Sequence, residues 1–206
     1  MIEPRKLLIA TNNLGKFREY VLLLDGLPFE LTSLAGERIR DEVEEGSSSM
    51  EHNAIYKATE YSRRSGLIAL ADDSGLEVDA LGGEPGPFSR RYAGEDVSDK
   101  QRNDFLLAKL SAVPWERRSA RFRCVIAIAT PRSGVETREG VCEGIIAFDS
   151  KGEGGFGYDP IFYLPELDRR MAELTIEEKN EISHRARAAH KVRPILELMA
   201  EQRSND

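Results

Sequence analysis

The chain has 206 residues, enough to bury the core of one domain over residues 1–206 without a disulfide or a structural metal. Its 29 Lys and Arg residues against 36 Asp and Glu residues give a net charge of −7, which disfavours non-specific binding of nucleic acid. No apolar stretch approaches the ~18 residues that cross a bilayer, and the two cysteines, Cys124 and Cys142, lack metal or CxxC spacing. We therefore expect a cytoplasmic protein with reduced core thiols and no membrane partner.

The N-terminal segment predicts a strand, a polar turn and a helix. Residues 7–10 form a short apolar run that stops at "TNNLGK". Apolar residues then recur at i, i+3, i+4 and i+7 from Phe17, which is the pattern of an amphipathic helix. A second strand is predicted over residues 29–34.

The next segment leads to a pair of adjacent acids. Residues 49–66 predict a helix with a serine as its cap and Gly66 as its stop. The apolar run at 67–71 predicts a short buried strand. Asp72 and Asp73 directly follow this strand, at the point where we expect the chain to leave its core.

A loop, a helix and two strands are predicted in the middle of the chain. Residues 81–94 contain too many Gly and Pro residues for the interior of an element, so we expect a loop. Ser98 and Gln101 form a capping box before an amphipathic helix. Alternating apolar residues over 121–130 predict a strand, and residues 140–148 predict its hairpin partner.

The C-terminal part begins with a second glycine-rich turn at 152–165. Thr175 and Glu178 form another capping box, which opens a helical region that Pro194 should kink or split. The mixture of helices, strands and hairpin signals predicts an α/β fold with a mixed sheet.

The turn "TNNLGK" has the chemistry of a phosphate site. The N-terminus of a helix presents backbone N–H groups and the positive end of the helix dipole, and Lys16 adds a full charge. The GxxxxGK[ST] spacing of a Walker A loop is absent. The alternative is an ordinary polar connection with a solvated lysine.

The run "DDSG" places two like charges side by side at Asp72 and Asp73. Mg²⁺ would relieve their repulsion, because it binds a few carboxylate oxygens and completes its shell with water and substrate phosphate. One aspartate could also orient or deprotonate an attacking water. The alternative is a turn in which Asp72 caps backbone N–H groups and Asp73 is solvated.

Two later runs, "GGFGYDP" and "EEKNEISHR", carry groups that suit a nucleotide. Phe156 can stack on a flat base, while His184 and Arg185 can donate to a carbonyl and Lys179 can meet a phosphate. The alternatives are a hairpin with buried aromatic residues and a helix surface capped at Ser183.

Six segments, in this order, closely resemble the Ham1/RdgB family of inosine triphosphate pyrophosphatases from about residue 7 to residue 189. They are "IATNNLGK", "LADDSGLEVDALGGEPG", "SRRYAG", "ARFRCVIAIA", "GGFGYDPIF" and "AELTIEEKNEISHRARA". The resemblance implies Mg²⁺-dependent hydrolysis of ITP, dITP and XTP to the monophosphate and pyrophosphate. It also implies an ITPase-like (Maf/Ham1) fold of two lobes, with a long mixed central sheet, a cleft between the lobes, and a homodimer.

The resemblance also implies roles for individual residues. Thr11, Asn13 and Lys16 match the family's TxNxxK phosphate-binding loop. Asp73 matches its catalytic, metal-associated aspartate, with Asp72 beside it. The matches to substrate contacts are Ser74, Phe156, Gly157, Tyr158, Asp159, Lys179, His184 and Arg185.

One segment departs from the family pattern. Many relatives read TFxENA where this chain reads "SMEHNA", so alignment on Asn53 puts His52 at the place of a metal-site glutamate. Glu51 is displaced by one residue, which is a rotation of about 100° on a helix. Glu44, Glu45 or water could fill the position, whereas the softer imidazole is a poor magnesium ligand. Glu51 stays in the candidate metal set beside the two aspartates.

The resulting hypothesis is attack by an activated water on the α-phosphorus, with pyrophosphate as the leaving group. Arg185 or His184 would select the keto group of hypoxanthine or xanthine, because adenine leaves those donors unpaired. Two other readings remain open. One is a Maf-type pyrophosphatase for modified pyrimidine nucleotides, and the other is a nucleotide sensor without catalysis.

Overall fold

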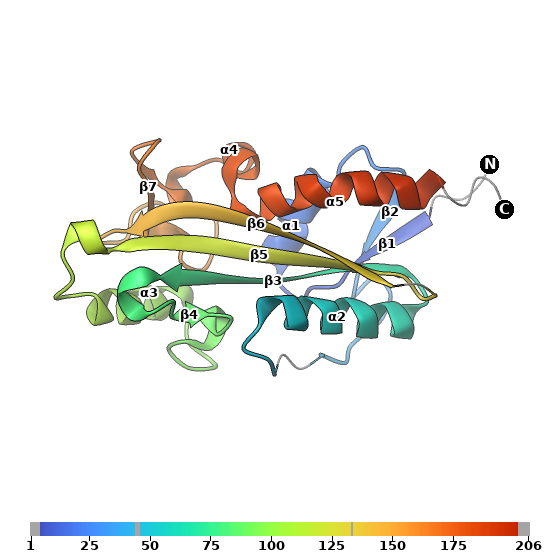
Figure 1. Cartoon of the computed structure of the whole chain (residues 1–206), viewed down its shortest axis with the longest axis horizontal. Coiled ribbons are helices and arrows are strands. Elements are labelled where there is room, and N and C mark those ends of the chain that lie inside the picture. The colour runs from blue at the N-terminus through green and yellow to red at the C-terminus, as the bar shows by residue number, and fades with distance from the viewer. Residues whose placement is uncertain (1–4, 44–45, 133, 202–206) are drawn as a thin grey trace. The chain divides into compact units, whose positions relative to one another are not determined.

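The structure is a computed structural model that describes residues 5–43, 46–132 and 134–201 (Figure 1). These residues form two compact units. Unit 1 is made of the described residues within Met1–Asp73, Cys124–Gly140 and Arg185–Asp206. Unit 2 is made of those within Ser74–Arg123 and Val141–His184.

Eight strands of the described chain form one mixed sheet with the order β2-β1-β3-β5-β6-β7-β8, and β4 pairs with β3 beside this path. β1 pairs in parallel with β2 and β3, whereas β4, β7 and β8 pair antiparallel with their neighbours. The predicted α/β fold with a long mixed sheet is therefore confirmed. The strands are β1 (Arg5–Ile9), β2 (Phe29–Ser33), β3 (Ile68–Val78), β4 (Pro85–Gly86), β5 (Ser119–Ala129), β6 (Val135–Ile146), β7 (Phe162–Leu164) and β8 (Arg169–Arg170).

In unit 1, helices cover both faces of the strands. Helices α1 (Leu14–Leu23) and α5 (His184–Glu201) lie on one face, and α2 (Met50–Ser65) lies on the other (Figure 1). Successive residues of β3 alternate between these faces. Leu70 packs with the residues of α1 and α5, whereas Ala69 and Ala71 pack with those of α2. Both faces are buried, which explains the continuous apolar run.

The ends of α2 follow the predicted signals. The Ser49 side chain accepts from the backbone N–H of His52, and Gly66 ends the helix in the left-handed conformation with φ 69°. By contrast, α5 continues through Pro194, so of the two predicted effects the split does not occur, and the kink stays a prediction. Val192 and Leu196 are fully buried on either side of the proline, and their packing holds the helix together across the missing hydrogen bond.

Unit 2 contains α3 (Asp99–Lys109) and α4 (Ile176–Ile182), and both predicted capping boxes are confirmed. The predicted loop at 81–94 includes β4 within an otherwise irregular path. The unit also has five 3₁₀ helices among its described residues: η1 (Asp79–Leu81), η2 (Ser89–Arg91), η3 (Trp115–Arg117), η4 (Asp159–Ile161) and η5 (Met171–Glu173). Its apolar core gathers residues from β3, α3, β5, β6, β7 and the turns between them.

The strand that carries the two aspartates is longer than predicted. β3 runs from Ile68 to Val78, so Asp72 and Asp73 lie within the strand and are buried. The prediction that the chain leaves its core at this pair is wrong. Pairing of Leu76 and Glu77 with β4 extends the strand past the polar residues, and tertiary pairing overrides their weak strand propensity.

Both cysteines are free and buried, as predicted. Cys124 lies in the apolar core of unit 1 and Cys142 in that of unit 2. Across the described residues, no helix has the length and apolar character needed to cross a membrane.

We expect Gly66→Ala to lower the free energy of unfolding by about 1–2 kcal/mol, because a Cβ disfavours the left-handed conformation. An added Cβ at this position meets no atom within 4 Å, so the loss would come from the backbone alone. Urea unfolding measures it. Gly66→Asn is the control, since Asn tolerates this conformation better and should lose less. Equal stability of wild type and Gly66→Ala would contradict the expectation.

Candidate functional site

The turn before α1 is organised by its own side chains. Asn13 Oδ1 accepts from the backbone N–H of Lys16 at 3.1 Å, and Thr11 Oγ1 accepts from the N–H of Asn13 at 3.1 Å. The first N–H groups of a helix have no acceptor within the helix, so those of Leu14 and Gly15 remain for an anion. Phosphate binding at this turn stays a prediction.

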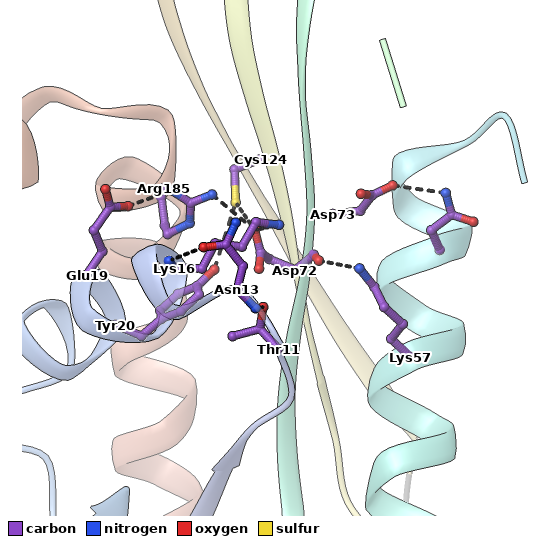
Figure 2. A network of polar contacts seen from close by, with 11 residues as sticks. Thr11, Asn13, Lys16, Glu19, Tyr20, Lys57, Asp72, Asp73, Cys124 and Arg185 are labelled. Atoms are coloured by element: carbon purple, nitrogen blue, oxygen red, sulfur yellow. Dashed lines mark hydrogen bonds and ion pairs between the residues drawn. The ribbon is translucent and has the colours of Figure 1, made fainter. Parts of the chain in front are cut away.

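A buried network of charges lies beside this turn (Figure 2). The carboxylate of Asp72, with 1% of its side chain exposed, lies 2.9 Å from Lys16 Nζ and 3.4 Å from Arg185 Nη2. Arg185 Nη1 lies 2.5 Å from the carboxylate of Glu19, which is also buried. Acids and bases therefore alternate, and the network balances its own charge.

The Asp72 carboxylate has a further partner, because Cys124 Sγ donates to it at 3.7 Å. Burial lowers the pKa of the Arg185 guanidinium, but the carboxylates of Glu19 and Asp72 outweigh it and raise that pKa well above its ordinary value. Arg185 is thus a permanent cation in the centre of unit 1.

Asp72 and Asp73 project from opposite faces of β3 (Figure 2). Asp72 meets Lys16 and Arg185, whereas Asp73 Oδ2 accepts from Asn53 Nδ2 at 2.9 Å. The two charges are tolerated because the strand separates them and because Asp72 has its own cations. A shared metal ion is not needed to explain the pair.

Helix α2 supplies two residues that sequence reasoning missed. Asn53 holds Asp73, and its amide also donates to the carbonyl of Ser47 at 3.0 Å. Lys57, one turn later and buried, donates to the carbonyl oxygen of Asp72 at 2.6 Å. The available signal was two polar residues at i and i+4 on the apolar face of an amphipathic helix.

The predicted metal ligands are not gathered into one group. Glu51 is exposed and accepts from Thr137 Oγ1 at 3.2 Å, while Asp72 is bound by cations. Within residues 5–43, 46–132 and 134–201, no three acidic, His or Cys side chains are placed to hold a metal ion. Glu44 and Glu45 lie outside the described residues. One oriented carboxylate, Asp73, fits a magnesium ion that takes its other oxygens from water and phosphate.

In unit 2, the residues around Phe156 form a second cluster. Asp159 accepts from the backbone N–H of Phe156 at 2.9 Å and from Lys179 Nζ at 2.6 Å. The ammonium group of Lys179 lies 4.7 Å from the centroid of the Phe156 ring. A Cβ on Gly155 would lie 2.0 Å from Asp159 Oδ2, so this close approach requires glycine.

The other predicted residues of unit 2 surround this cluster or lie on β3. Tyr158 is buried and donates to the carbonyl of Ser89 at 2.9 Å, and burial raises the pKa of its hydroxyl well above the ordinary value. His184 stacks on Phe122 with ring centroids 4.8 Å apart. Ser74 is half-buried on β3. Gly157 has a left-handed backbone and hydrogen bonds to α3.

The structure thus divides the predicted residues between two clusters, and the chain passes from unit 2 to unit 1 between His184 and Arg185. The sequence offered either of these two neighbours as the donor to a keto group. His184 stacks on an aromatic ring of unit 2, whereas both ion pairs of Arg185 are with carboxylates of unit 1. The unit 1 cluster includes Thr11, Asn13, Lys16, Asp72 and Arg185, and the unit 2 cluster includes Phe156, Gly157, Tyr158, Asp159 and Lys179. Asp73, also in unit 1, lies on the other face of β3 with Asn53.

Comparison with known proteins gives consistent matches over nearly the whole chain. The model of the Ham1 family matches residues 7–195. A protein of Desulforamulus reducens named dITP/XTP pyrophosphatase is 51% identical, and the match covers 93% of this chain and 95% of that protein. One of the same name from Bacillus subtilis is 44% identical, with 96% and 100% covered.

Solved structures agree with these matches. A HAM1 protein from Coxiella burnetii has a TM-score of 0.85 and 41% identity, with 93% of this chain and 98% of that chain covered. The Ham1 protein of Staphylococcus aureus has a TM-score of 0.84 and 40% identity, with 94% and 98% covered.

We expect Arg185→Met to lower the free energy of unfolding by about 3–5 kcal/mol, because it leaves two buried carboxylates without their shared cation. Urea unfolding of the variant measures the loss. Arg18→Met, at an exposed position of α1, is the matched control and should change stability by about 0.5 kcal/mol or less. If both variants were equally stable, the buried network would not hold unit 1 together.

Proposed function

This chain belongs to the Ham1 family, and we propose that it hydrolyses non-canonical purine nucleoside triphosphates such as ITP, dITP and XTP. The products are the nucleoside monophosphate and pyrophosphate, and the role is removal of damaged purines from the nucleotide pool. The observation that carries the proposal is the identity of 51% and 44%, over 93% and 96% of the chain, to relatives named dITP/XTP pyrophosphatase.

The triphosphate is assigned to the cluster of unit 1. The N-terminus of α1 offers backbone N–H groups, and Thr11 and Asn13 shape the turn that presents them. The side chain of Lys16 is 16% exposed, so its ammonium group can reach a phosphate while Asp72 holds it from the buried side. Arg185 maintains the charge of Asp72, and its predicted contact with the substrate base stays a prediction.

Asp73 is assigned as the catalytic carboxylate. Asn53 fixes one of its oxygens, which orients the group without adding a positive charge. A carboxylate held in this way can align a water for attack on the α-phosphorus and accept its proton. A magnesium ion bound at Asp73 would supply positive charge to the phosphate oxygens. Asp72 contributes by holding Lys16, and a metal role for Asp72 or Glu51 stays a prediction.

The base is assigned to the cluster of unit 2. The Phe156 ring is half-buried, and its flat face can stack on a purine. Lys179 and Asp159 hold this ring and its backbone in one position. His184 is the donor of unit 2 that we assign to the keto group of hypoxanthine or xanthine, and the amino group of adenine would leave that donor unpaired.

We also keep three predictions that accompany this function. The whole chain acts as one enzyme domain over residues 1–206, it forms a homodimer, and it works in the cytoplasm on a small nucleotide without nucleic acid or membrane partners.

Pyrophosphate release from ITP, XTP, GTP, ATP and a modified pyrimidine triphosphate, each with magnesium and with EDTA, tests the proposal. We expect rapid release from ITP and XTP and none with EDTA. Release from ATP should be at least about tenfold slower, because adenine lacks the keto group. Release from GTP should also be slower, because the site has to exclude the additional amino group of guanine. Release confined to the pyrimidine nucleotide would favour a Maf-type enzyme. Binding of ITP without release would favour a sensor.

Asp73→Asn should reduce turnover of ITP by about 100-fold or more, because the amide cannot accept the proton of the attacking water. Steady-state release of pyrophosphate at saturating ITP measures this. Asp96→Asn, at an exposed position, is the charge-matched control and should keep wild-type activity. Retention of most activity in a folded Asp73→Asn variant would remove Asp73 from the mechanism.

A further inference from the structure

The first turn of α3 binds the backbone of Gly157 from both sides. Asp99 Oδ2 accepts from the N–H of Gly157 at 2.6 Å. Asn103 Nδ2 donates to the carbonyl oxygen of Gly157 at 3.1 Å. Residues four apart share one face of a helix, so α3 presents an acceptor and a donor that match the two backbone groups of one residue.

The two side chains of α3 are themselves held in place. Ser98 and Gln101 form the capping box that fixes the start of α3. Arg102 pairs with the second oxygen of Asp99 and also donates to the carbonyl of Val97 at 3.1 Å. Asn103 is buried. The contacts to Gly157 therefore come from a rigid support.

Gly157 directly follows Phe156, the ring assigned to the base. Gly157 has a left-handed backbone with φ 64°. The N–H of Phe156 is bound by the side chain of Asp159, and both the N–H and the carbonyl oxygen of Gly157 are bound by α3. These hydrogen bonds fix the peptide groups on both sides of Phe156, and hence the direction in which its side chain leaves the backbone.

We propose that Asp99 and Asn103 are positioning residues for the purine base. They hold Gly157 and thereby fix Phe156 in the orientation that stacks on the base. The sequence motifs gave α3 no part in the site, because its capping box and apolar face account for it as a packing helix. The proposal rests on the proposed function, and its test separates the two.

The test compares Asp99→Ala and Asn103→Leu with wild type in steady-state hydrolysis of ITP. Asp99 has 49% of its side chain exposed, so its removal leaves no buried cavity, and leucine keeps the volume of Asn103 while removing the donor. Loss of the hydrogen bond to Gly157, which in Asp99→Ala is accompanied by loss of the ion pair with Arg102, should raise KM for ITP about threefold to tenfold. Turnover at saturation should stay within about twofold of wild type, since the phosphate cluster is unchanged.

Two further variants serve as an intermediate case and as a control in the kinetic comparison. Asp99→Asn keeps an acceptor for the N–H of Gly157, so its KM should fall between those of wild type and Asp99→Ala. In wild type, the carboxylate of Asp104 pairs with Lys100 on the same helix. Asp104→Asn is therefore the matched control, and it should leave KM unchanged. An equal increase in KM for Asp104→Asn and Asp99→Ala would overturn the proposal.

Inorganic tripolyphosphate is the probe that lacks a base. Its inhibition constant should be the same in wild type, Asp99→Ala and Asn103→Leu. Lys16→Met should raise the inhibition constant, because the variant lacks the ammonium group assigned to the phosphate. Weaker inhibition in the α3 variants, or a fall in turnover without a rise in KM, would show a general structural effect and overturn the proposal.

Hydrogen exchange of residues 155–158 tests the contact without catalysis. Exchange at the N–H of Gly157 should become faster in Asp99→Ala, and remain as in wild type in Asp104→Asn. Unchanged exchange in Asp99→Ala would overturn the proposal even with an active enzyme. Failure of wild type to release pyrophosphate from ITP would instead refute the proposed function, and the exchange result would still decide whether α3 holds the loop.

Discussion

The buried carboxylate of Asp72 is the constraint on which unit 1 depends. An ionised group in this position is stable only when cations accompany it, and Lys16 from α1 and Arg185 from α5 meet it there. Glu19 then balances Arg185. One strand and two helices from distant parts of the sequence are thus joined by charge as well as by apolar packing.

The buried carboxylate of Asp72 also fixes the position of a charged group in the candidate site. Because Lys16 is drawn toward Asp72, its ammonium group is held at the N-terminus of α1, where a phosphate would bind. On the other face of the strand, Asn53 orients Asp73 without neutralising it. The two adjacent aspartates therefore differ in these partners: Asp72 lies beside Lys16 and Arg185, and Asp73 accepts a hydrogen bond from Asn53. The catalytic role proposed for Asp73 stays a prediction.

In unit 2, the aromatic ring of Phe156 is held in place although it belongs to a glycine-rich segment. The ring of Phe156 lies near the ammonium group of Lys179, and the surrounding backbone is bound by Asp159 and by α3. Glycine permits the path, and hydrogen bonds from more regular elements remove the freedom that glycine brings. Stacking on a base would then depend also on residues that do not contact the base.

The sequence by itself determined most elements and the family, because caps, periodicity and motifs are local signals. The caps at Ser49, Ser98 and Thr175 are examples. It also determined that Asp73, Lys16 and Phe156 are candidate site residues. Only the tertiary structure decided that β3 continues through the aspartates, that α5 continues through Pro194, and that Arg185 pairs with acids. Those outcomes depend on partners distant in the sequence, whose packing and charges override local propensity.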